Sequence, residues 1–224
     1  MKIEIWSDIV CPFCYIGKRK FEKALDGFGA KDNVEIVWRS FQLDPEMQPV
    51  AGQSVHEYLA MRKGVSPEKG KEMNDYMSGI AKEEGLEYNF DKAIISNTLD
   101  AHRLLHFAKT KGLQNEIKER LFKAYYTEGR NIGDQDTLAQ LGQEVGLDAT
   151  EIKSALQTDA YKQDVELDQY EANQVGARGV PFFVFNDKYA VSGAQPTDVF
   201  TQVLNKVWEE EKPVVLSATQ LIDA

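Results

Sequence analysis

The two cysteines of the chain, Cys11 and Cys14, are separated by two residues and could form a redox-active dithiol. An alternating apolar run over 2–6 predicts a strand before them, and apolar residues at helical spacing over 16–25 predict a helix after them. Cys11 would then lie at the helix N-terminus, where unpaired N–H groups and the helix dipole favour a thiolate and lower the thiol pKa. Cys14, one turn further along, would be placed to attack a mixed disulfide on Cys11.

A metal site is one alternative use of these sulfurs, because His102 and His106 are four residues apart on one predicted helical face. Two cysteines and two histidines form a ligand set that zinc accepts. However, the histidines follow the cysteines by roughly ninety residues, far outside the spacing of a zinc finger. The preferred interpretation is therefore a dithiol that works without a bound metal. The simplest alternative is a cysteine pair that has no redox role.

Charge and composition limit the classes of partner and compartment. The 224 residues carry a formal net charge of −10 at pH 7, which argues against nucleic acid or an anionic membrane as a partner. No apolar run is long enough to span a bilayer, and the first residues enter a predicted strand without the pattern of a secretory signal. Because the one motif uses both cysteines, none is left for a structural disulfide, and we expect a cytoplasmic protein.

The remaining patterns predict an α/β fold in which a long helical segment interrupts the sheet. A β-rich stretch over 34–41 follows the first helix, and β character returns over 180–185 and 189–193 before a last helix near 196–210. Only helical patterns occur between about 54 and 174. Capping signatures mark three of these helix starts, at Ser54, Ser66 and Asp148. Such a sheet needs helices on both faces.

Four stretches resemble the DsbA-like branch of the thioredoxin superfamily and, within it, the cytoplasmic FrnE-type oxidoreductases. They are SDIVCPFC (7–14), NTLDAHRL (97–104), EGRNIGD (128–134) and GARGVPFF (176–183). The likeness extends over essentially the whole chain and implies a thioredoxin-like fold with a large all-helical insertion. Residues 1–50 and 178–224 would form the discontinuous thioredoxin-like domain, and residues 51–177 the inserted helical domain. The apolar tail after Pro213 would pack on the domain or on another subunit.

The resemblance also implies roles for individual residues. Cys11 would be the nucleophile and Cys14 the second thiol of a dithiol–disulfide centre. The peptide bond between Val180 and Pro181 would be cis, in a loop packed against the cysteines. The exposed backbone of Val180 could then pair with an extended substrate.

Further residues could tune this centre. Pro12 and Phe13 lie between the cysteines and would affect the redox potential, and family members often have tryptophan at position 13. Asp8 or Glu4 could accept the proton of the second thiol, although helix capping by Asp8 is the simpler interpretation. His102 could stabilise the nucleophile by its charge, although packing is the commoner role of a helical histidine.

The leading hypothesis is a thiol–disulfide oxidoreductase or isomerase acting on protein or peptide thiols and disulfides. An apolar rim of Phe13, Tyr15 and Phe182 would suit unfolded peptides. No separate cofactor is expected; glutathione is a candidate co-substrate, and the protein would be a monomer or homodimer. Two alternatives stay open. One is a glutathione-dependent transferase or isomerase resembling the kappa-class transferases and 2-hydroxychromene-2-carboxylate isomerases; the other is a binding module that does not use its thiols.

Overall fold

The computed structural model describes residues 1–211, which are built around a mixed four-stranded sheet. The strands are β1 (Lys2–Ser7), β2 (Glu35–Ser40), β3 (Phe182–Phe185) and β4 (Tyr189–Ser192). Their order is β2-β1-β3-β4, with β1 parallel to β2 and antiparallel to β3, and with β3 antiparallel to β4. All four predicted strands are therefore confirmed, with ends that differ by one or two residues.

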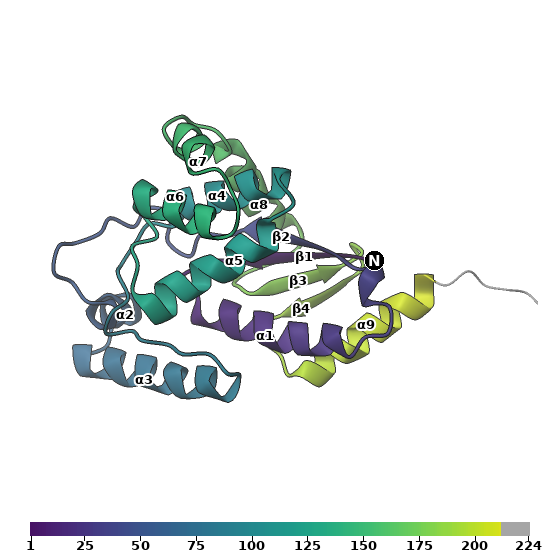
Figure 1. Cartoon of the computed structure of the whole chain (residues 1–224). Coiled ribbons are helices and arrows are strands. Elements are labelled where there is room, and N and C mark those ends of the chain that lie inside the picture. Colours follow the sequence, from purple (N-terminus) through teal and green to yellow (C-terminus); the bar gives the residue numbers. More distant parts are fainter. Residues whose placement is uncertain (212–224) are drawn as a thin grey trace, which may run out of the picture.

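Helices cover both faces of the sheet, as predicted (Figure 1). On one face lie α1 (Pro12–Asp26) and α9 (Thr197–Glu211), packed on a core that includes Ile5 and Phe183. The other face is covered by α8 (Lys162–Gln174), and Trp6 belongs to that core. Successive side chains of a strand point to opposite faces, so the alternation in β1 supplies both cores. Each large apolar side chain buried in this way contributes roughly 1.5–3 kcal/mol.

The segment between β2 and β3 is helical apart from its loops in the described structure, which confirms the predicted insertion. Its helices are α2 (Val55–Lys63), α3 (Pro67–Glu83), α4 (Leu99–Thr110), α5 (Gln114–Lys123), the π-helical turn η2 (Ala124–Glu128), α6 (Gln135–Glu144), α7 (Ala149–Leu156) and α8. The predicted caps are present, because Ser54, Ser66 and Asp148 accept hydrogen bonds from N–H groups of the first helical turn. A short 3-10 helix, η1 (Lys31–Asn33), precedes β2.

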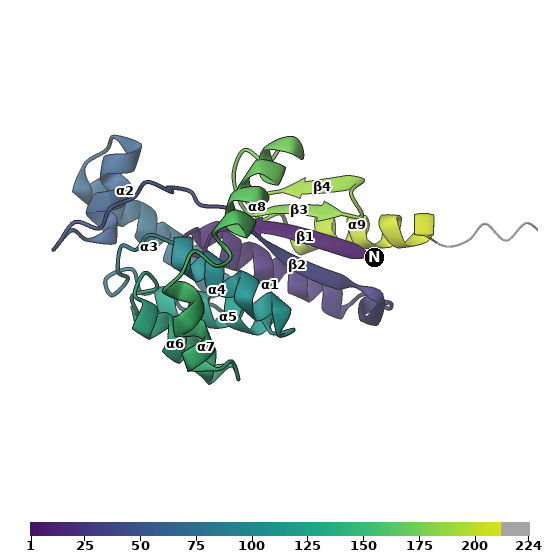
Figure 2. The same cartoon turned by 90° about the horizontal axis from the view of Figure 1, so that it is seen from above.

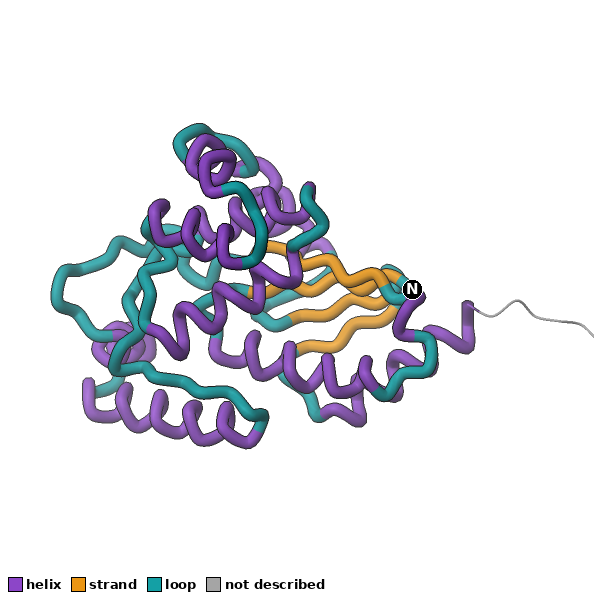
Figure 3. The backbone as a smooth tube through the Cα atoms, viewed as in Figure 1, coloured by secondary structure: helices purple, strands orange, loops and turns teal. Residues whose placement is uncertain are grey.

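The insertion gathers at the end of the sheet where β1 leads into α1 (Figures 2 and 3). One continuous core joins Ile9, Cys11 and Cys14 to insertion residues such as Leu104 and Phe122. The division into separate units at 50 and 178 stays a prediction. The predicted packing of the tail after Pro213 lies outside the described residues.

Side chains of the insertion also satisfy the outer edge of β2, which is an edge strand. Gln114 at the start of α5 accepts a hydrogen bond from the Trp38 N–H and donates one to its carbonyl. Asp168 of α8 accepts a hydrogen bond from the Ser40 N–H. These contacts cover an edge that would otherwise be open to another chain. In the part of the chain that the structure describes, no helix combines the length and apolar character needed to cross a membrane.

Candidate active site

The two cysteines lie at the junction of β1 and α1, as predicted. Cys11 is the N-cap residue of α1 with an extended backbone, and Pro12 is the first helical residue. Proline suits this position because the N–H of the first turn has no helical partner. The Cys14 N–H donates a hydrogen bond to the Cys11 carbonyl at 3.0 Å, which places the second sulfur one turn into the helix. Both residues are free thiols in this structure.

Both thiols are largely covered, yet Cys11 lies close to the surface. Only 4% of Cys11 and 1% of Cys14 is exposed. In contrast, Phe13 between them is 47% exposed, and Val10 and Val180 beside them are partly exposed. Cys11 is therefore buried, but its neighbours along the chain and in the loop before β3 reach the surface.

The loop before β3 contacts Cys11 directly. The Val180–Pro181 bond is cis, as the resemblance implies, and the Cys11 thiol donates a hydrogen bond to the Val180 carbonyl at 3.3 Å. Gly17 of α1 allows this approach, because a Cβ at that position would lie 2.9 Å from Pro181 Cγ. Nothing in the sequence pattern singled out Gly17, which is one of two glycines within the first 27 residues.

The protonation of Cys11 differs from the sequence-based prediction. Its pKa is raised, first by a hydrogen bond with the Cys14 thiol, then by burial, and further by the charges of Cys14 and Asp8. The Cys14 backbone N–H acts in the opposite direction but does not outweigh these effects. The prediction of a lowered pKa is therefore wrong for this buried dithiol. It considered the helix N-terminus but not the desolvation of a covered sulfur.

Asp8 and His102 form a buried pair behind the loop that carries Cys11. One Asp8 oxygen lies 3.2 Å from His102 Nε2, and the other accepts a hydrogen bond from the Leu43 N–H at 2.8 Å. The Asp8 side chain therefore does not cap α1, which was the simpler expectation; Cys11 itself occupies the N-cap position. Burial lowers the pKa of His102 and Asp8 only partly opposes this, so a neutral imidazole results near pH 7. It does not supply the charge that was predicted.

Of the three aromatic residues predicted to form an apolar rim, only Phe13 is exposed. Tyr15 is buried, its ring stacks on Phe122 with centroids 4.7 Å apart, and its hydroxyl donates to Glu119 at 2.6 Å. Phe182 is buried in the core beneath α8. The predicted rim is therefore wrong for Tyr15 and Phe182, because an aromatic residue type does not tell which face of its element points outward.

Glu4 and His106 belong to a second buried group, which we call the edge cluster: Glu4, Arg39, Ser40, His106 and Asp168. Arg39 pairs with Glu4 and, at 2.7 Å, with Asp168. Asp168 also lies 3.0 Å from His106 Nε2 and accepts the Ser40 N–H. Burial would raise the pKa of Asp168, but hydrogen bonds from His106 and Ser40 lower it. The cluster ties β1, β2, α4 and α8 together at the edge of the sheet.

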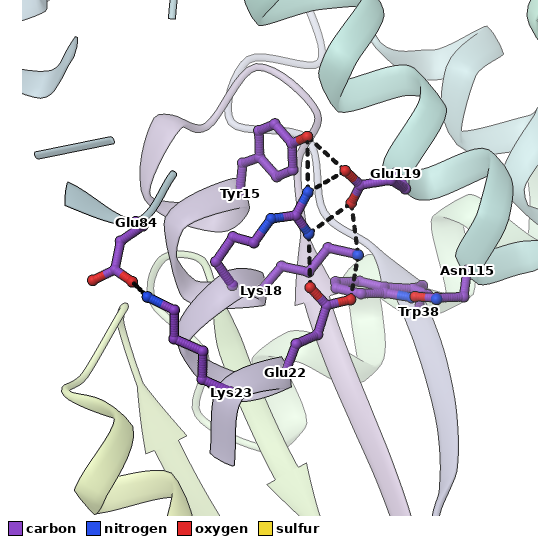
Figure 4. A network of polar contacts seen from close by, with 9 residues as sticks. Tyr15, Lys18, Glu22, Lys23, Trp38, Glu84, Asn115 and Glu119 are labelled. Carbon is purple, nitrogen blue, oxygen red and sulfur yellow. Dashed lines mark hydrogen bonds and ion pairs between the residues drawn. The ribbon is translucent and has the colours of Figure 1, made fainter. Parts of the chain in front are cut away.

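A network between α1 and α5 was not anticipated from the sequence (Figure 4). Glu119 accepts hydrogen bonds from the Tyr15 hydroxyl at 2.6 Å and from Lys18 Nζ at 2.7 Å, and it pairs with Arg19. Burial would raise the pKa of Glu119, but Arg19 and Lys18 bring it down to about 2. Neither this network nor the adjacent Lys118 has a local sequence signal, because the contacts join residues about 100 positions apart.

A small cavity adjoins the loop before Cys11. Its volume is about 40 Å³, and its lining includes Asp8, Val10, Tyr58 and Tyr125. A space of this size holds one or a few water molecules. This cavity is therefore too small to hold a peptide or a tripeptide thiol.

Comparison with known proteins agrees with this geometry. A family model described as a DSBA-like thioredoxin domain matches residues 2–205. The crystal structure of the probable DsbA oxidoreductase SCO1869 from Streptomyces coelicolor is 42% identical, with a TM-score of 0.89, over 97% of this chain and 94% of that chain. The uncharacterized protein YwbO of Bacillus subtilis (strain 168) is 35% identical over 206 residues, 91% of this chain and 95% of that protein.

A more distant structure shares the fold alone. The cytosolic disulfide reductase DsbM from Pseudomonas aeruginosa, solved with GSH, is 18% identical. Its TM-score is 0.67, over 93% of this chain and 100% of that chain.

Proposed function

Because the chain belongs to the DSBA-like thioredoxin domain family, we propose that it is a thiol–disulfide oxidoreductase or isomerase whose working pair is Cys11 and Cys14. One observation carries the proposal. The Cys11 sulfur lies at the start of α1, 3.3 Å from the carbonyl of Val180, with the second thiol one turn along the same helix. This arrangement combines a nucleophile, a resolving thiol and a backbone segment that could hold a substrate.

The exchange has two covalent steps. The Cys11 thiolate attacks one sulfur of a substrate disulfide, whose S–S bond breaks while the other sulfur leaves with the electron pair and takes up a proton. Cys14 then loses its proton and attacks Cys11, which releases the second substrate sulfur and closes the Cys11–Cys14 disulfide. Two electrons have passed to the substrate, and two further thiols restore the dithiol by the reverse steps.

The contact with Val180 gives the backbone loop a place in this cycle. In the free protein its carbonyl accepts the Cys11 thiol proton. Once Cys11 is part of a mixed disulfide it has no proton to donate, and the carbonyl is released for the N–H of an extended peptide. Phe13, exposed beside it, would contact apolar side chains of that peptide. Pro12 and Phe13 would also tune the redox potential.

We propose reduction or isomerisation of protein or peptide disulfides in the cytoplasm, by a FrnE-type member of the family working as a monomer or homodimer. The support is that the motif holds both cysteines of the chain, which leaves none for a structural disulfide. A reducing compartment would keep the pair in the dithiol state. Glutathione is the proposed electron donor.

The test is insulin reduction with glutathione as donor, combined with trapping of covalent complexes. Cys11→Ala should lose the activity completely, whereas Cys14→Ala should accumulate mixed disulfides because nothing resolves them. Equal amounts of covalent complex in both variants would contradict the assigned order of attack. A wild-type protein that does not reduce insulin, together with a Cys11→Ser, Cys14→Ser variant that binds unfolded peptide as tightly as the wild type, would favour the binding module. Conjugation of glutathione to 1-chloro-2,4-dinitrobenzene without insulin reduction would favour the transferase alternative.

A further inference from the structure

Lys118 of α5 is fully buried and pairs with no carboxylate in the part of the chain that the structure describes. None of its surface is exposed, and its Nζ has no hydrogen-bond partner among residues 1–211. The rings of Trp38 and Phe122 lie 5.3 and 4.9 Å from Nζ. Such cation–π contacts stabilise an ammonium by much less than the cost of removing it from water. An unpaired buried polar group of this kind calls for an explanation.

Lys18 shows how a buried lysine is accommodated when its role is to hold elements together. Its side chain is 2% exposed, but its Nζ pairs with both Glu22 and Glu119. Lys118 directly precedes Glu119 in the sequence, yet no such pairing reaches it. Of these two buried ammonium groups, Lys18 is paired with carboxylates and Lys118, within residues 1–211, is not.

The position of Lys118 relates it to the dithiol. Trp38 belongs to the core on the sheet face that carries α1, and Phe122 stacks on Tyr15, the residue that follows Cys14. Lys118 lies against both rings, so its Nζ is placed where α5 packs on the sheet and, through Phe122, on Tyr15 of α1.

The titratable groups that act most strongly on Lys118 belong to α1, to the loop before it and to α4. Cys11, Cys14 and Lys18 belong to α1 or its N-cap, Asp8 to the loop before it, and His102 to α4. Burial lowers the pKa of Lys118 to about 8, and the charges of Cys14, Asp8 and Cys11 act against this. Both carboxylate oxygens of Asp8 are engaged by His102 and Leu43. The cysteines are therefore the groups near Lys118 whose charge changes during thiol–disulfide exchange.

We propose that Lys118 is a positioning residue for the dithiol: a buried ammonium, supplied by the helical insertion, that stabilises the thiolate released when the Cys11–Cys14 bond breaks. The proposal rests on the proposed function above. When two substrate thiols reduce the bond, they supply two electrons and join in a disulfide. One of their two protons stays on Cys11, which keeps its hydrogen bond to the Val180 carbonyl, so the thiolate is that of Cys14. The other proton goes to Lys118 if its Nζ is neutral, or to solvent if it is already charged. The reduced centre then holds one thiolate and one ammonium, with no net charge.

The experiment compares two substitutions on the same helix. Lys118→Met removes the buried charge and keeps a side chain of similar length, whereas Lys123→Met removes an exposed charge from α5 and so controls for net charge. The equilibrium of each protein with reduced and oxidised glutathione is measured at pH 7. We expect Lys118→Met to shift the constant about tenfold toward the disulfide, which corresponds to about 30 mV for a two-electron couple. Lys123→Met should stay within about twofold of the wild type, because an exposed charge is screened.

A second readout reports how the charge of Lys118 acts on the other sulfur, that of Cys11. In a Cys14→Ala background, the rate of Cys11 alkylation by iodoacetamide is followed against pH with and without Lys118→Met. We expect the midpoint to rise by about one pH unit, since one unit is a tenfold change in ionisation. Lys118→Gln, which is also neutral, repeats both measurements if the methionine variant folds poorly.

The outcomes separate this inference from the proposed function. A wild-type protein that equilibrates with glutathione while Lys118→Met gives the same constant and the same alkylation profile would overturn the role of Lys118 alone. A wild-type protein whose cysteines never equilibrate with glutathione would overturn both proposals.

Discussion

Two groups of buried polar side chains lie at the insertion end of the sheet, and they differ in whether their polar atoms are paired. In the edge cluster, the charges of Arg39, Asp168 and Glu4 meet in ion pairs. Of the five buried side-chain atoms without a hydrogen-bond partner within residues 1–211, one is Arg120 Nη1, and the other four belong to β1, α4, α5 and η2, the elements that meet around the dithiol. These four atoms are Ser7 Oγ, His102 Nδ1, Lys118 Nζ and Tyr126 Oη, which we call the unpaired group.

This difference separates a structural role from a functional one. A fully satisfied buried network fixes the relative position of the elements that supply it. A buried polar atom without a partner costs about 1–3 kcal/mol, and more if it is charged. The edge cluster therefore positions β2, α4 and α8. The unpaired group lowers stability where the proposed chemistry takes place, as expected of a functional site.

Asp168→Ala disrupts the edge cluster and should cause the largest loss of stability. The substitution removes one of the two buried carboxylates that pair with Arg39 and the acceptor of the Ser40 N–H, and breaking a buried ion pair from one side costs about 3–5 kcal/mol. Urea unfolding should show this loss, while the glutathione equilibrium of the folded protein stays within about twofold of the wild type. Glu171→Ala is the matched control, because Glu171 also pairs with Arg39, at 3.4 Å, but is 37% exposed. It should cost at most about 1 kcal/mol. If Asp168→Ala also cost no more than about 1 kcal/mol, the edge cluster would not have the structural role assigned to it.

Lys118→Met tests the unpaired group, where removal of a buried polar side chain should raise the free energy of unfolding. Below pH 8 Lys118 is charged in both states, so the folded protein bears the full penalty of its burial. Between about pH 8 and 10.5 the unfolded chain holds a proton that the folded protein has released, so the free energy of unfolding rises with pH. The gain in unfolding free energy from Lys118→Met should therefore be greatest below pH 8, and it should shrink by up to roughly 3 kcal/mol by pH 10.5.

Unfolding of both proteins is measured in a Cys11→Ser, Cys14→Ser background, where no thiolate titrates. Without the cysteine charges the pKa of Lys118 is lower still, so the window starts at a lower pH. Lys123→Met serves as the control and should show no such dependence on pH. A difference between Lys118→Met and its parent that stays constant from pH 7 to 10 would mean that the pKa of Lys118 is not lowered in the folded protein.

The sequence could predict those parts of the site that depend on neighbours along the chain. The strand before Cys11, the helix after it and the caps at Ser54, Ser66 and Asp148 follow from local patterns. The contact between Cys11 and the loop at Val180 joins distant segments, and it was anticipated only through the family resemblance.

The remaining parts depend on how the insertion packs, which no local pattern encodes. Lys118 reads as an ordinary helical lysine until α5 lies against Trp38. Tyr15 was expected at the surface, but α5 covers it with Glu119 and Phe122. The pKa of Cys11 was predicted with the wrong sign for the same reason, since burial cannot be deduced from a position at a helix N-terminus.

Glu119→Gln asks whether pairing, rather than location near the dithiol, decides if a buried charge stabilises the fold. The Glu119 carboxylate has a pKa of about 2 in the folded protein, below its usual 4.5, so its contribution is present above pH 4.5 and is lost as pH falls toward 2. Because the side chain is 33% exposed, solvent screening limits the effect to about 1–2 kcal/mol. Glu119→Gln should lose this amount at pH 7 and converge with the wild type near pH 2. Glu116→Gln, an exposed change on the same helix, should stay within about 0.5 kcal/mol of the wild type at both pH values.

Gly17→Ala is expected to have the smallest effect, and it tests how closely the loop at Pro181 is held against α1. Replacing glycine by alanine within a helix stabilises it by about 1 kcal/mol when space is available. At Gly79 of α3 nothing lies within 4 Å of the added Cβ, so Gly79→Ala should show this gain in urea unfolding. At Gly17 the added Cβ would lie 2.9 Å from Pro181 Cγ, so the loop must shift and the gain in stability should be cancelled.

The same substitution should also affect exchange, because Val180 in that loop accepts a hydrogen bond from Cys11. Insulin reduction should slow about two- to fivefold, which corresponds to roughly 0.4–1 kcal/mol in the barrier. A Gly17→Ala protein that gains as much stability as Gly79→Ala and reduces insulin at the wild-type rate would show that the loop tolerates displacement, and the 3.3 Å contact would then have no role in exchange.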